Sequence, residues 1–492
     1  MDLGAERATD HEPLNIVVLG SSFAGLAVAH KFLRNTIEEI GVTRSAPRYK
    51  LVLVGPSTCL YWNIGAPRAI VDATRLPIDK VFIPFLPLFQ DYQRTRFQYI
   101  QGKATSIDFP SRTVIVEDVD TTSWSSQASR TEGEKRTSGV ATKRMVQFHA
   151  LVIATGSSAD SPLLSLHGPH EKTVKELQAF HERVAYASSI IIAGGGPSGI
   201  ECAGQLATWG KKDKKAKSLH AMTSSGSDSV EFEEASSWRR LRKPTPEDGN
   251  EGEARPSSAP VARSSNARKT IILISGHDRL LPRLPPEYGA QAEAKLKKLG
   301  VSIIHNYRVE RAVETGSGSI RCILDDEYAI SCDVFLPATG LHPNTDFMPP
   351  DMLTASGYID ADPQSLRVPN VERVYAIGDC ASHSKNSIQD VYDSLPVVLQ
   401  NLKVDLLAYE YRREHPFGGQ GVEAKLEALE DFAYVQNPTD SQLMPISRFG
   451  GVGILFGIKL PSFMVWLMKG RDYKIARAKL AAGAGKNPYT II

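Results

Sequence analysis

The chain has 492 residues, of which 42% are hydrophobic and 23% are charged, and its formal net charge is +2. This length predicts two or three domains with sizeable cores, and the nearly neutral charge gives no sign of a nucleic-acid partner. The five cysteines are scattered and never spaced C-x-x-C. That pattern is typical of a reducing compartment and argues against a metal site and against a redox-active dithiol after the first helix.

The first residues of the chain carry no targeting pattern. Residues 1–8 are polar and of mixed charge, unlike a secretory signal or a transit peptide. N-myristoylation requires a glycine directly after the initiator methionine, and Asp2 occupies that place. We therefore expect a cytoplasmic protein that is not secreted.

The first strand and helix enclose a turn of small residues. Residues 16–19 are typical of a buried parallel strand, and a helix is predicted from about Phe23 to Ile40. The turn has the pattern Gly20-x-Ser22-x-x-Gly25, one residue away from the dinucleotide fingerprint G-x-G-x-x-G. In that fingerprint the backbone and a helix N-terminus approach a pyrophosphate. A glycine-rich turn without a ligand is the alternative, and a complete second copy of the pattern favours the nucleotide.

The second strand, residues 49–55, lacks an acidic residue that the fingerprint predicts. Dinucleotide-binding folds usually place this acid at the end of the strand to hold ribose hydroxyls, but Gly55 stands here. Backbone or serine hydroxyl groups must therefore recognise the ribose. Arg68 follows in an aromatic segment, where contact with a phosphate and capping of a helix end are equally expected.

The next segments predict a small sheet. We expect strands at 102–108 and 113–117, then an extended, poorly ordered connection at 118–144. Residues 149–156 form a hydrophobic strand that ends in Ala-Thr-Gly.

A second nucleotide unit begins at Ser189. The complete fingerprint Gly194-x-Gly196-x-x-Gly199 lies between a predicted strand and a predicted helix. Its partner strand, 270–275, arrives only after residues 211–269, which we interpret as a disordered surface insertion with a solvated lysine run. That run comprises Lys211, Lys212, Lys214, Lys215 and Lys217.

The order of motifs then repeats. The sequence predicts a helix and four strands, at 284–299, 301–305, 320–324, 328–331 and 333–340. The last of these also ends in Ala-Thr-Gly, so strand, fingerprint and Ala-Thr-Gly occur twice, which indicates an internal duplication. Residues 374–380 are typical of a buried strand that delivers Asp379 at its end.

These motifs together resemble the two-dinucleotide-domain flavoproteins of the pyridine nucleotide–disulfide reductase superfamily. The chain is most similar to the apoptosis-inducing-factor-like, ferroptosis-suppressor-type quinone reductases and to the related type II NADH dehydrogenases. The resemblance implies an α/β fold of two Rossmann-like domains and a small C-terminal α+β interface domain. It implies an FAD-binding domain of residues 12–160 and 342–412, an NAD(P)H-binding domain of residues 186–341 with the insertion 211–269, and an interface domain of residues 413–492.

The resemblance also implies roles for individual residues. The FAD would be held by Gly20, Ser21, Ser22, Phe23, Ala24, Gly25, Arg68, Ala104, Ala154, Thr155, Gly156 and Asp379. NADH or NADPH would be held by Gly194, Gly196, Gly199, Ser275, Arg279 and Gly340. Glu201 matches an acid near the contact between nicotinamide and flavin, although an acid in the first turns of a helix is equally expected for its dipole alone.

Two departures from the family pattern concern the coenzyme and the flavin. Ser275 stands where an acid would hold the second ribose, and His277 and Arg279 follow it, so NADPH is a candidate donor. Residues 382–391 do not align with the family, so the residue beside the flavin N1/C2 edge is not identified.

The function implied is hydride transfer from NAD(P)H to FAD and then transfer of two electrons to a quinone-like acceptor. One alternative is a reductase of a small iron–sulfur or rubredoxin-type protein. Others are a slowly turning-over redox-signalling flavoprotein and a scaffold without cofactor, the last suggested by Ser22 and Gly55. The chain is expected to be a monomer or a homodimer.

The C-terminal residues 449–468 are nearly apolar and about as long as a membrane helix. Lys459 and Pro461 divide them, and their glycines favour a buried strand pair and helix over a membrane span. A third option is that 463–468 and the basic residues after it rest on a membrane surface, such as the mitochondrial outer membrane or a lipid droplet.

Overall fold

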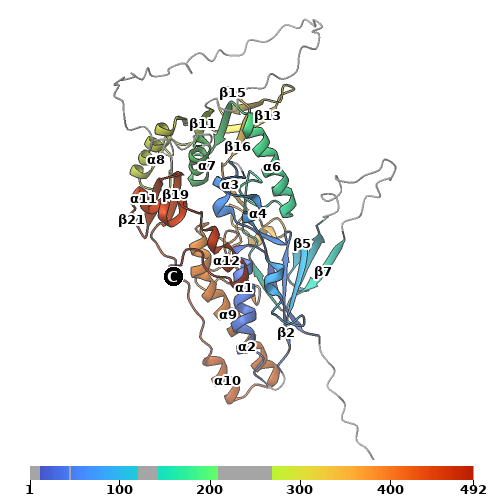
Figure 1. Ribbon diagram of the computed structural model, residues 1–492. Helices are drawn as coiled ribbons and strands as arrows, with labels where there is room; N and C mark the ends of the chain where they lie inside the picture. Colours follow the sequence, from blue (N-terminus) through green and yellow to red (C-terminus); the bar gives the residue numbers. More distant parts are fainter. Residues whose placement is uncertain (1–11, 44–45, 72, 120–141, 209–268, 491–492) are drawn as a thin grey trace, which may run out of the picture. The chain divides into compact units, whose positions relative to one another are not determined.

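A computed structural model describes residues 12–43, 46–71, 73–119, 142–208 and 269–490 (Figure 1). Most of the predicted connection at 118–144 and nearly all of the predicted insertion at 211–269, with its lysine run, lie outside these residues. The chain divides into two compact units. Unit 1 comprises Met1–His181 and Pro337–Ile492, and unit 2 comprises Glu182–Leu336.

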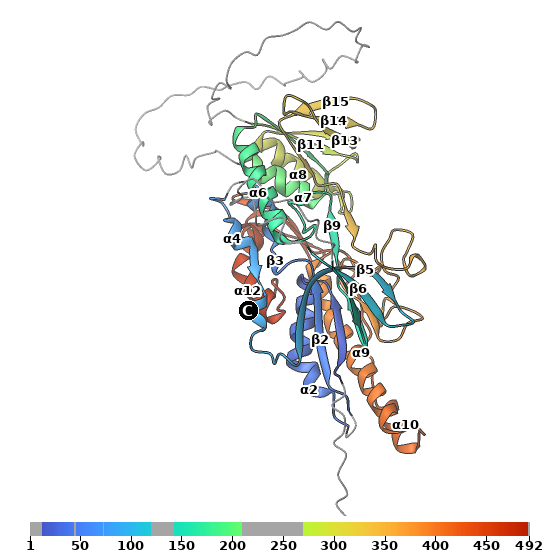
Figure 2. The same cartoon turned by 90° about the vertical axis from the view of Figure 1, so that its right-hand side faces the viewer.

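Unit 1 is organised around a seven-stranded sheet with the strand order β18-β8-β1-β2-β5-β6-β7. The first five strands pair in parallel. Strand β6 pairs antiparallel with β5, beside which Figure 2 shows it, and β7 pairs antiparallel with β6. The strands are β1 (Leu14–Leu19), β2 (Tyr49–Gly55), β5 (Phe97–Asp108), β6 (Thr113–Asp118), β7 (Lys143–Gln147), β8 (Ala150–Ile153) and β18 (Val374–Ala376).

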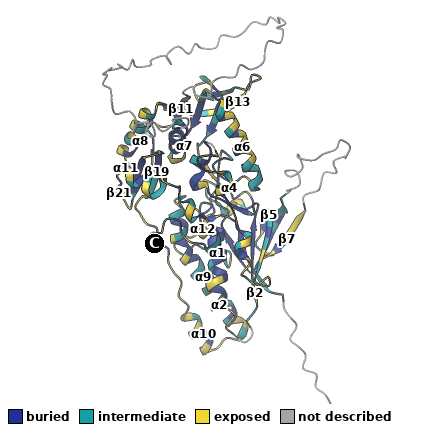
Figure 3. Ribbon diagram, viewed as in Figure 1, coloured by how far each residue is buried: buried dark blue, intermediate teal, exposed yellow. Residues whose placement is uncertain are grey.

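The central strands are buried because both faces of the sheet are covered. The last four residues of β1 and every residue of β8 and β18 are buried, as expected for apolar, β-branched strands of a parallel sheet (Figure 3). One face is packed by a cluster that includes Val17, Val52 and Leu151. Because these strands are parallel, their carboxyl ends lie at one edge of the sheet, where the fingerprint turn begins.

Helix α1 (Phe23–Lys31) leaves the end of β1 and is buried over almost its whole length. It lies beside α9 (Ile388–Glu414) and α12 (Ala478–Ala484), so an Ala- and Gly-rich sequence lets three helices approach closely (Figure 1). A π-helical turn (Phe32–Thr36) and α2 (Ile37–Glu39) continue it. The predicted helix from Phe23 to Ile40 is thus confirmed, with an irregular second half.

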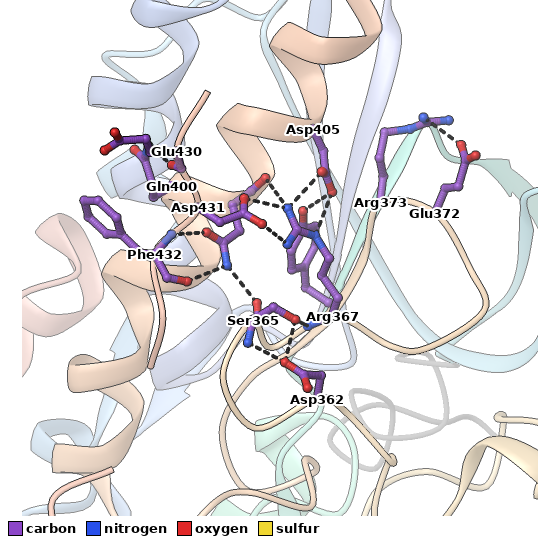
Figure 4. Close-up of polar contacts among 12 residues, drawn as sticks. Asp362, Ser365, Arg367, Glu372, Arg373, Gln400, Asp405, Glu430, Asp431 and Phe432 are labelled. Atoms are coloured by element: carbon purple, nitrogen blue, oxygen red, sulfur yellow. Dashed lines mark hydrogen bonds and ion pairs between the residues drawn. The ribbon is translucent and has the colours of Figure 1, made fainter. Parts of the chain in front are cut away.

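Arg367 joins three segments behind this sheet (Figure 4). Its guanidinium donates to both carboxylate oxygens of Asp405 on α9, at 2.9 and 3.1 Å, and to Asp431 at 2.6 Å. The ring of Tyr375 on β18 lies under the guanidinium, and its hydroxyl donates to Asp405. These contacts fix β18 against α9 and so position the residues that follow β18.

Smaller elements complete unit 1. Two-stranded sheets pair β3 with β4 and β9 with β17, and the C-terminal residues form an antiparallel hairpin of β19 and β20 with the short β21. The bounds are β3 (Cys59–Tyr61), α3 (Ala66–Ala69), α4 (Ile78–Val81), β4 (Phe82–Pro84), β9 (Ser157–Ala159), α6 (His170–Tyr186), β17 (Leu341–Pro343), α10 (Gln420–Glu427), β19 (Gln442–Ser447), β20 (Gly450–Leu455), β21 (Ile458–Lys459) and α11 (Ser462–Val465).

The C-terminal residues therefore form the strand pair and helix that the sequence favours. In the part of the chain that the structure describes, no helix is long and apolar enough to cross a membrane. As the favoured interpretation of the sequence expects, glycines and Pro461 divide residues 449–468 into a hairpin and a short helix.

Unit 2 repeats the first strand–turn–helix arrangement. Its parallel sheet has the order β12-β11-β10-β16, and a three-stranded antiparallel sheet of β13, β14 and β15 packs against it through buried side chains such as Ile191 and Cys322. The elements are β10 (Ser189–Ala193), α7 (Pro197–Ala207), β11 (Thr270–Ser275), α8 (Pro286–Leu299), β12 (Val301–His305), β13 (Val309–Glu314), β14 (Ile320–Leu324), β15 (Ala329–Cys332) and β16 (Val334–Pro337).

Candidate functional site

The turn between β1 and α1 requires its outer glycines. Gly20 has a φ of +112°, and a Cβ there would lie 2.1 Å from the carbonyl oxygen of Ala154. A Cβ at Gly25 would lie 1.7 Å from the carbonyl oxygen of Gly20. The helix therefore starts directly against the strand end, which is the close approach that the fingerprint needs.

The N-terminus of α1 is free to receive an anion. Ser22 is its N-cap residue, yet its side chain makes no capping hydrogen bond, and the first turn contains no acidic residue. The backbone N–H groups of this turn form the positive end of the helix dipole, and neither a capping side chain nor an acid in the first turn compensates that charge. Ser22 is exposed, so a serine in place of the second glycine does not fill the turn.

Gly55 at the end of β2 is explained by Ser21. The Ser21 hydroxyl donates to the carbonyl oxygen of Ser57 at 3.2 Å, which places the side chain between the turn and the strand end. A Cβ at Gly55 would lie only 2.1 Å from Ser21 Oγ and 2.6 Å from Ser21 Cβ. An acid at position 55 is therefore incompatible with Ser21.

The Ala-Thr-Gly segment after β8 is held by Asn344. Thr155 Oγ1 donates to the Asn344 carbonyl at 2.8 Å, and Asn344 Nδ2 donates to the Thr155 carbonyl at 2.9 Å. Gly156 has a φ of +65°, which favours glycine. Ala154 touches the turn at Gly20, so this segment and the fingerprint turn lie together as predicted from the motif order.

Asp379 lies just after β18 and is half-buried. Burial raises the pKa of the Asp379 carboxyl to about 6, a hydrogen bond from Ser157 lowers it, and the charge of Asp390 raises it. The Ser157 hydroxyl lies 3.2 Å from Asp379 Oδ2. A half-buried carboxyl at the carboxyl edge of the sheet, which accepts a hydrogen bond from Ser157, is a group that a polar ligand can satisfy.

Arg68 is held by the C-terminal residues. Its guanidinium donates to the carbonyl oxygens of Gly470 at 2.6 Å and Arg471 at 3.0 Å, and it lies 4.5 Å from the centre of the Tyr473 ring. Trp62 reinforces this contact, because its Nε1 donates to the Tyr473 carbonyl at 2.8 Å. The predicted contact of Arg68 with FAD stays a prediction.

The Trp62 ring also lies 5.4 Å from the ring of Phe23, the first residue of α1. The fingerprint helix is thereby connected to the C-terminal turn through one aromatic side chain. Ala104, which the resemblance places beside the adenine, is buried in β5 at a register shift of the sheet.

The second fingerprint repeats this geometry in unit 2. Gly194 has a φ of +122°, and a Cβ at Gly199 would lie 1.9 Å from the Gly194 carbonyl oxygen. Gly196 is the N-cap of α7, with open space where its Cβ would be and no acid in the first helical turn. The N-terminus of α7 is thus open to a pyrophosphate in the same way as that of α1.

The remaining residues that are predicted to hold NAD(P)H are placed as follows. Ser275 is fully buried, and its hydroxyl donates to the Arg279 carbonyl at 3.3 Å, so it shapes the loop after β11. Arg279 donates to the Pro282 carbonyl at 3.0 Å. Glu201 is 4% exposed and lies beyond the first turn of α7, and Gly340 has open space around its Cβ position.

Sequence reasoning missed the residues that hold the motifs in place. Ser157, Asn344 and Trp62 lie outside every recognised pattern, and their partners are 222, 189 and 411 residues away in the chain. Only the position of Ser157, directly after Ala-Thr-Gly, was a usable signal.

Both turns therefore fit a dinucleotide. Each has a glycine whose Cβ would strike backbone, a helix N-terminus without a capping side chain, and no acid in the first helical turn. This combination defines a class of protein that binds two dinucleotides on two Rossmann-like units.

The comparisons with known proteins name the family. The model of the pyridine nucleotide-disulphide oxidoreductases matches residues 14–396, and the chain belongs to this family. It is 30% identical over 481 residues to "Oxidoreductase phnG" of Penicillium herquei, covering 96% of both chains. It is 25% identical over 203 residues to "Ferroptosis suppressor protein 1" of Xenopus tropicalis, covering 40% of this chain and 41% of that protein.

Among solved structures, NDH2 of Plasmodium falciparum has the same fold, with a TM-score of 0.55, 12% identity and coverage of 96% of both chains. These findings confirm the predicted family, the fold of two Rossmann-like domains, and the cofactor FAD with NAD(P)H as donor. The chain is an NAD(P)H-dependent flavoprotein oxidoreductase.

Proposed function

We propose that the chain transfers two electrons from NAD(P)H through FAD to a quinone-like acceptor. The observation that carries this proposal is the placement of the cysteines. All five are described, and all are buried free thiols. Unit 1 contains only Cys59 on β3 and Cys380 after Asp379, and neither lies on the fingerprint helix α1.

An acceptor that does not receive electrons from a dithiol must take them from the flavin itself. A quinone suits this route because it accepts two electrons and two protons and becomes a quinol. The balance is one NAD(P)H, one proton and one quinone giving one NAD(P)⁺ and one quinol. FAD supplies the two-electron redox chemistry when bound.

The residues of the chain contribute binding and orientation. The turn at Gly20–Gly25 would hold the FAD pyrophosphate at the N-terminus of α1, and Asp379 would accept hydrogen bonds from FAD hydroxyl groups. The turn at Gly194–Gly199 would hold NAD(P)H at the N-terminus of α7. Glu201 would orient the nicotinamide, which is a positioning role.

Anaerobic titration of the purified yellow protein with NADH and then NADPH tests donor use, with bleaching of the flavin as the readout. Steady-state NAD(P)H oxidation is then measured with and without a water-soluble quinone. We expect the quinone to accelerate turnover strongly, and a Cys59→Ala/Cys380→Ala variant to retain this acceleration. Loss of quinone reduction in that variant, at unchanged flavin content, contradicts a direct route from flavin to quinone.

The same measurements separate the alternative functions. If the reduced flavin is reoxidised by a small iron–sulfur protein or a rubredoxin but by no quinone, the chain is a reductase of such proteins. If neither acceptor accelerates reoxidation, a slowly turning-over redox-signalling flavoprotein is the better description.

We further propose that the C-terminal hairpin rests on an anionic membrane surface, where lipid-soluble quinones are found. Residues 441–471 contain four basic residues and no Asp or Glu. The hairpin, α11 and the turn after it also expose large apolar side chains to water, and contact with a membrane surface would remove them from it. These are Phe449, Phe456, Ile458, Phe463 and Leu467.

Co-sedimentation with vesicles tests this contact. We expect the protein to pellet with vesicles that contain phosphatidylserine, less with phosphatidylcholine alone, and less at high salt. Phe456→Ser/Phe463→Ser should weaken binding. Phe417→Ser is the matched control, because Phe417 is fully exposed but lies between α9 and α10. Equal binding by all three proteins, or none at low salt, contradicts the proposal.

A further inference from the structure

The carboxyl end of β11 is the position where a Rossmann-like unit distinguishes NADH from NADPH. An acid there binds the ribose 2′-hydroxyl, and an arginine nearby accommodates the 2′-phosphate. In unit 2 this position is Ser275, whose side chain is fully buried. Its hydroxyl accepts a hydrogen bond from the His277 N–H at 3.4 Å and donates to the Arg279 carbonyl at 3.3 Å. Ser275 thus turns the loop and offers nothing to a ribose.

The fingerprint turn packs directly against Ser275. A Cβ at Gly195 would lie 2.5 Å from Ser275 Oγ and 2.8 Å from Ser275 Cβ, so the turn presses directly on this side chain. A longer carboxylate at position 275 would be buried against the turn without a partner. Unit 2 therefore lacks the usual NADH-selecting acid for a packing reason.

The next residue brings an arginine to the same place. Gly276 has no side chain, and Arg308 lies across it: a Cβ at position 276 would be 2.9 Å from Arg308 Cγ and 3.1 Å from Arg308 Nε. Arg308 comes from the segment after β12, which is fixed beside the loop by two backbone hydrogen bonds. Asn306 N donates to the His277 carbonyl at 3.1 Å, and Tyr307 N donates to the Ser275 carbonyl at 3.2 Å.

Basic side chains gather around this point, and an acid also lies near it: the Asp325 N–H donates to the Arg308 carbonyl at 3.0 Å. His277 and Arg308 are exposed, Arg279 is half-buried, and the one acid in the loop, Asp278, is exposed. The nearest acid on the neighbouring helix, Glu293, is paired with Lys297 at 2.8 Å and with His305 at 3.1 Å. A dianionic group beside Gly276 would meet the guanidinium of Arg308, and guanidinium groups bind phosphate in a bidentate manner.

We propose that Arg308 is the residue that selects NADPH, by binding the 2′-phosphate of the coenzyme over Gly276, with His277 beside it. This inference deepens the proposed function, because it concerns the same NAD(P)H site. Arg308 comes from the segment after β12, and its side chain occupies the space that is left open because position 276 is a glycine.

Two small ligands that differ only in the 2′-phosphate test the proposal on the FAD-loaded, full-length protein. Calorimetric titration compares adenosine 2′,5′-bisphosphate with 5′-AMP. Because phosphate and arginine form charge-assisted hydrogen bonds, we expect the wild type to bind the bisphosphate roughly 10- to 100-fold more tightly at low salt. Arg308→Gln should remove most of this preference by weakening the bisphosphate alone, and Arg308→Lys should keep part of it.

Arg311→Gln is the matched control, because Arg311 is exposed on β13 and its loss changes the net charge equally. It should keep the wild-type preference. Equal affinity of the wild type for both ligands, or an unchanged preference in Arg308→Gln, overturns the role of Arg308. Failure of the wild type to bind either ligand instead overturns the assignment of the nucleotide site in unit 2, on which the proposed function rests.

Discussion

The two nucleotide-binding turns are built on the same plan but exchange one pair of residues. In unit 1 the serine is in the turn, at Ser21, and the glycine is at the strand end, at Gly55. In unit 2 the glycine is in the turn, at Gly195, and the serine is at the strand end, at Ser275. In each unit one serine side chain fills the space between the turn and the second strand.

This exchange explains why both ribose acids are missing. A side chain on the glycine of either pair would approach the serine within 2.1 Å in unit 1 and 2.5 Å in unit 2. The space holds one small side chain, so an acid is excluded from Gly55, while Ser275 is enclosed by the turn. The missing acids make each site look degenerate in the sequence, but in the structure a serine side chain fills the place. Neighbouring residues must therefore recognise each ribose.

The largest effects are expected from alanine at the third glycine of each turn. A Cβ would lie 1.7 Å from backbone oxygen at Gly25 and 1.9 Å at Gly199, and backbone cannot move aside without displacing the helix. We expect Gly25→Ala to abolish FAD binding, so that the protein is colourless. Gly199→Ala should leave the protein yellow but no longer bleached by NAD(P)H. Visible absorbance before and after addition of the donor measures both.

Gly421→Ala is the control for these variants, because its Cβ position has open space and it lies in α10, outside both turns. It should leave flavin content unchanged. If Gly25→Ala retains stoichiometric FAD, the close approach of α1 to β1 is not what binds the cofactor, and the comparison between the turns loses its basis.

The carboxyl of Asp379 in unit 1 gives the next largest effect. The pKa of Asp379 is raised to about 6 in the folded protein, from its usual 3.8. Between these values the folded state holds a proton that the unfolded state has lost, so the stability of the protein without FAD falls as pH rises through this window. The loss amounts to about 3 kcal/mol. Urea unfolding at several pH values between 4 and 6.5 measures it.

Asp379→Asn should remove this pH dependence, whereas Asp346→Asn, whose side chain is 89% exposed, should keep it. The same slope in Asp379→Asn and in the wild type contradicts the assignment of the titration to Asp379.

The sequence predicted what local patterns encode. The strand–turn–helix units, the amphipathic helix before β12 and the start of the strand predicted at 374–380 need only alternation, glycine spacing and apolar runs, so they were found nearly where they were predicted. Strand β18 itself already ends at Ala376. The Ser21–Gly55 contact was not predictable, because it joins residues 34 positions apart whose spacing has no fixed rule. The absence of an acid was visible, but its packing cause was not.

Exchanging the residues of one pair gives an effect of intermediate size. Gly55→Ser alone places a second side chain against Ser21, and we expect a loss of about 2 kcal/mol in the free energy of unfolding. Adding Ser21→Gly moves the single serine to the strand end, as in unit 2, and should recover most of that loss. Chemical denaturation of the four proteins of this cycle measures the coupling. If the loss of unfolding free energy in the double variant equals the sum of the losses in the two single variants, the side chains at positions 21 and 55 do not compete for one space.

The smallest effect separates what the sequence and the structure say of Arg68. The resemblance predicts that Arg68 contacts FAD, whereas in the structure its guanidinium holds the carbonyls of Gly470 and Arg471 and lies on the Tyr473 ring. Arg68→Lys keeps the charge but loses the second hydrogen bond and the planar stacking, so we expect a loss of about 1 kcal/mol in stability. Hydrogen exchange should increase in residues 466–473, and flavin content should stay unchanged.

Arg94→Lys, at an exposed arginine of unit 1, is the matched control and should change neither quantity. If Arg68→Lys instead loses FAD without faster exchange at 466–473, Arg68 acts on the cofactor and its contacts with the C-terminal turn are secondary. The distinction matters for the comparison of the two units, because Trp62 contacts both Phe23 at the start of α1 and the carbonyl of Tyr473. A loosened C-terminal turn with intact FAD shows that the fingerprint of unit 1 positions itself, as that of unit 2 does, through its own glycines.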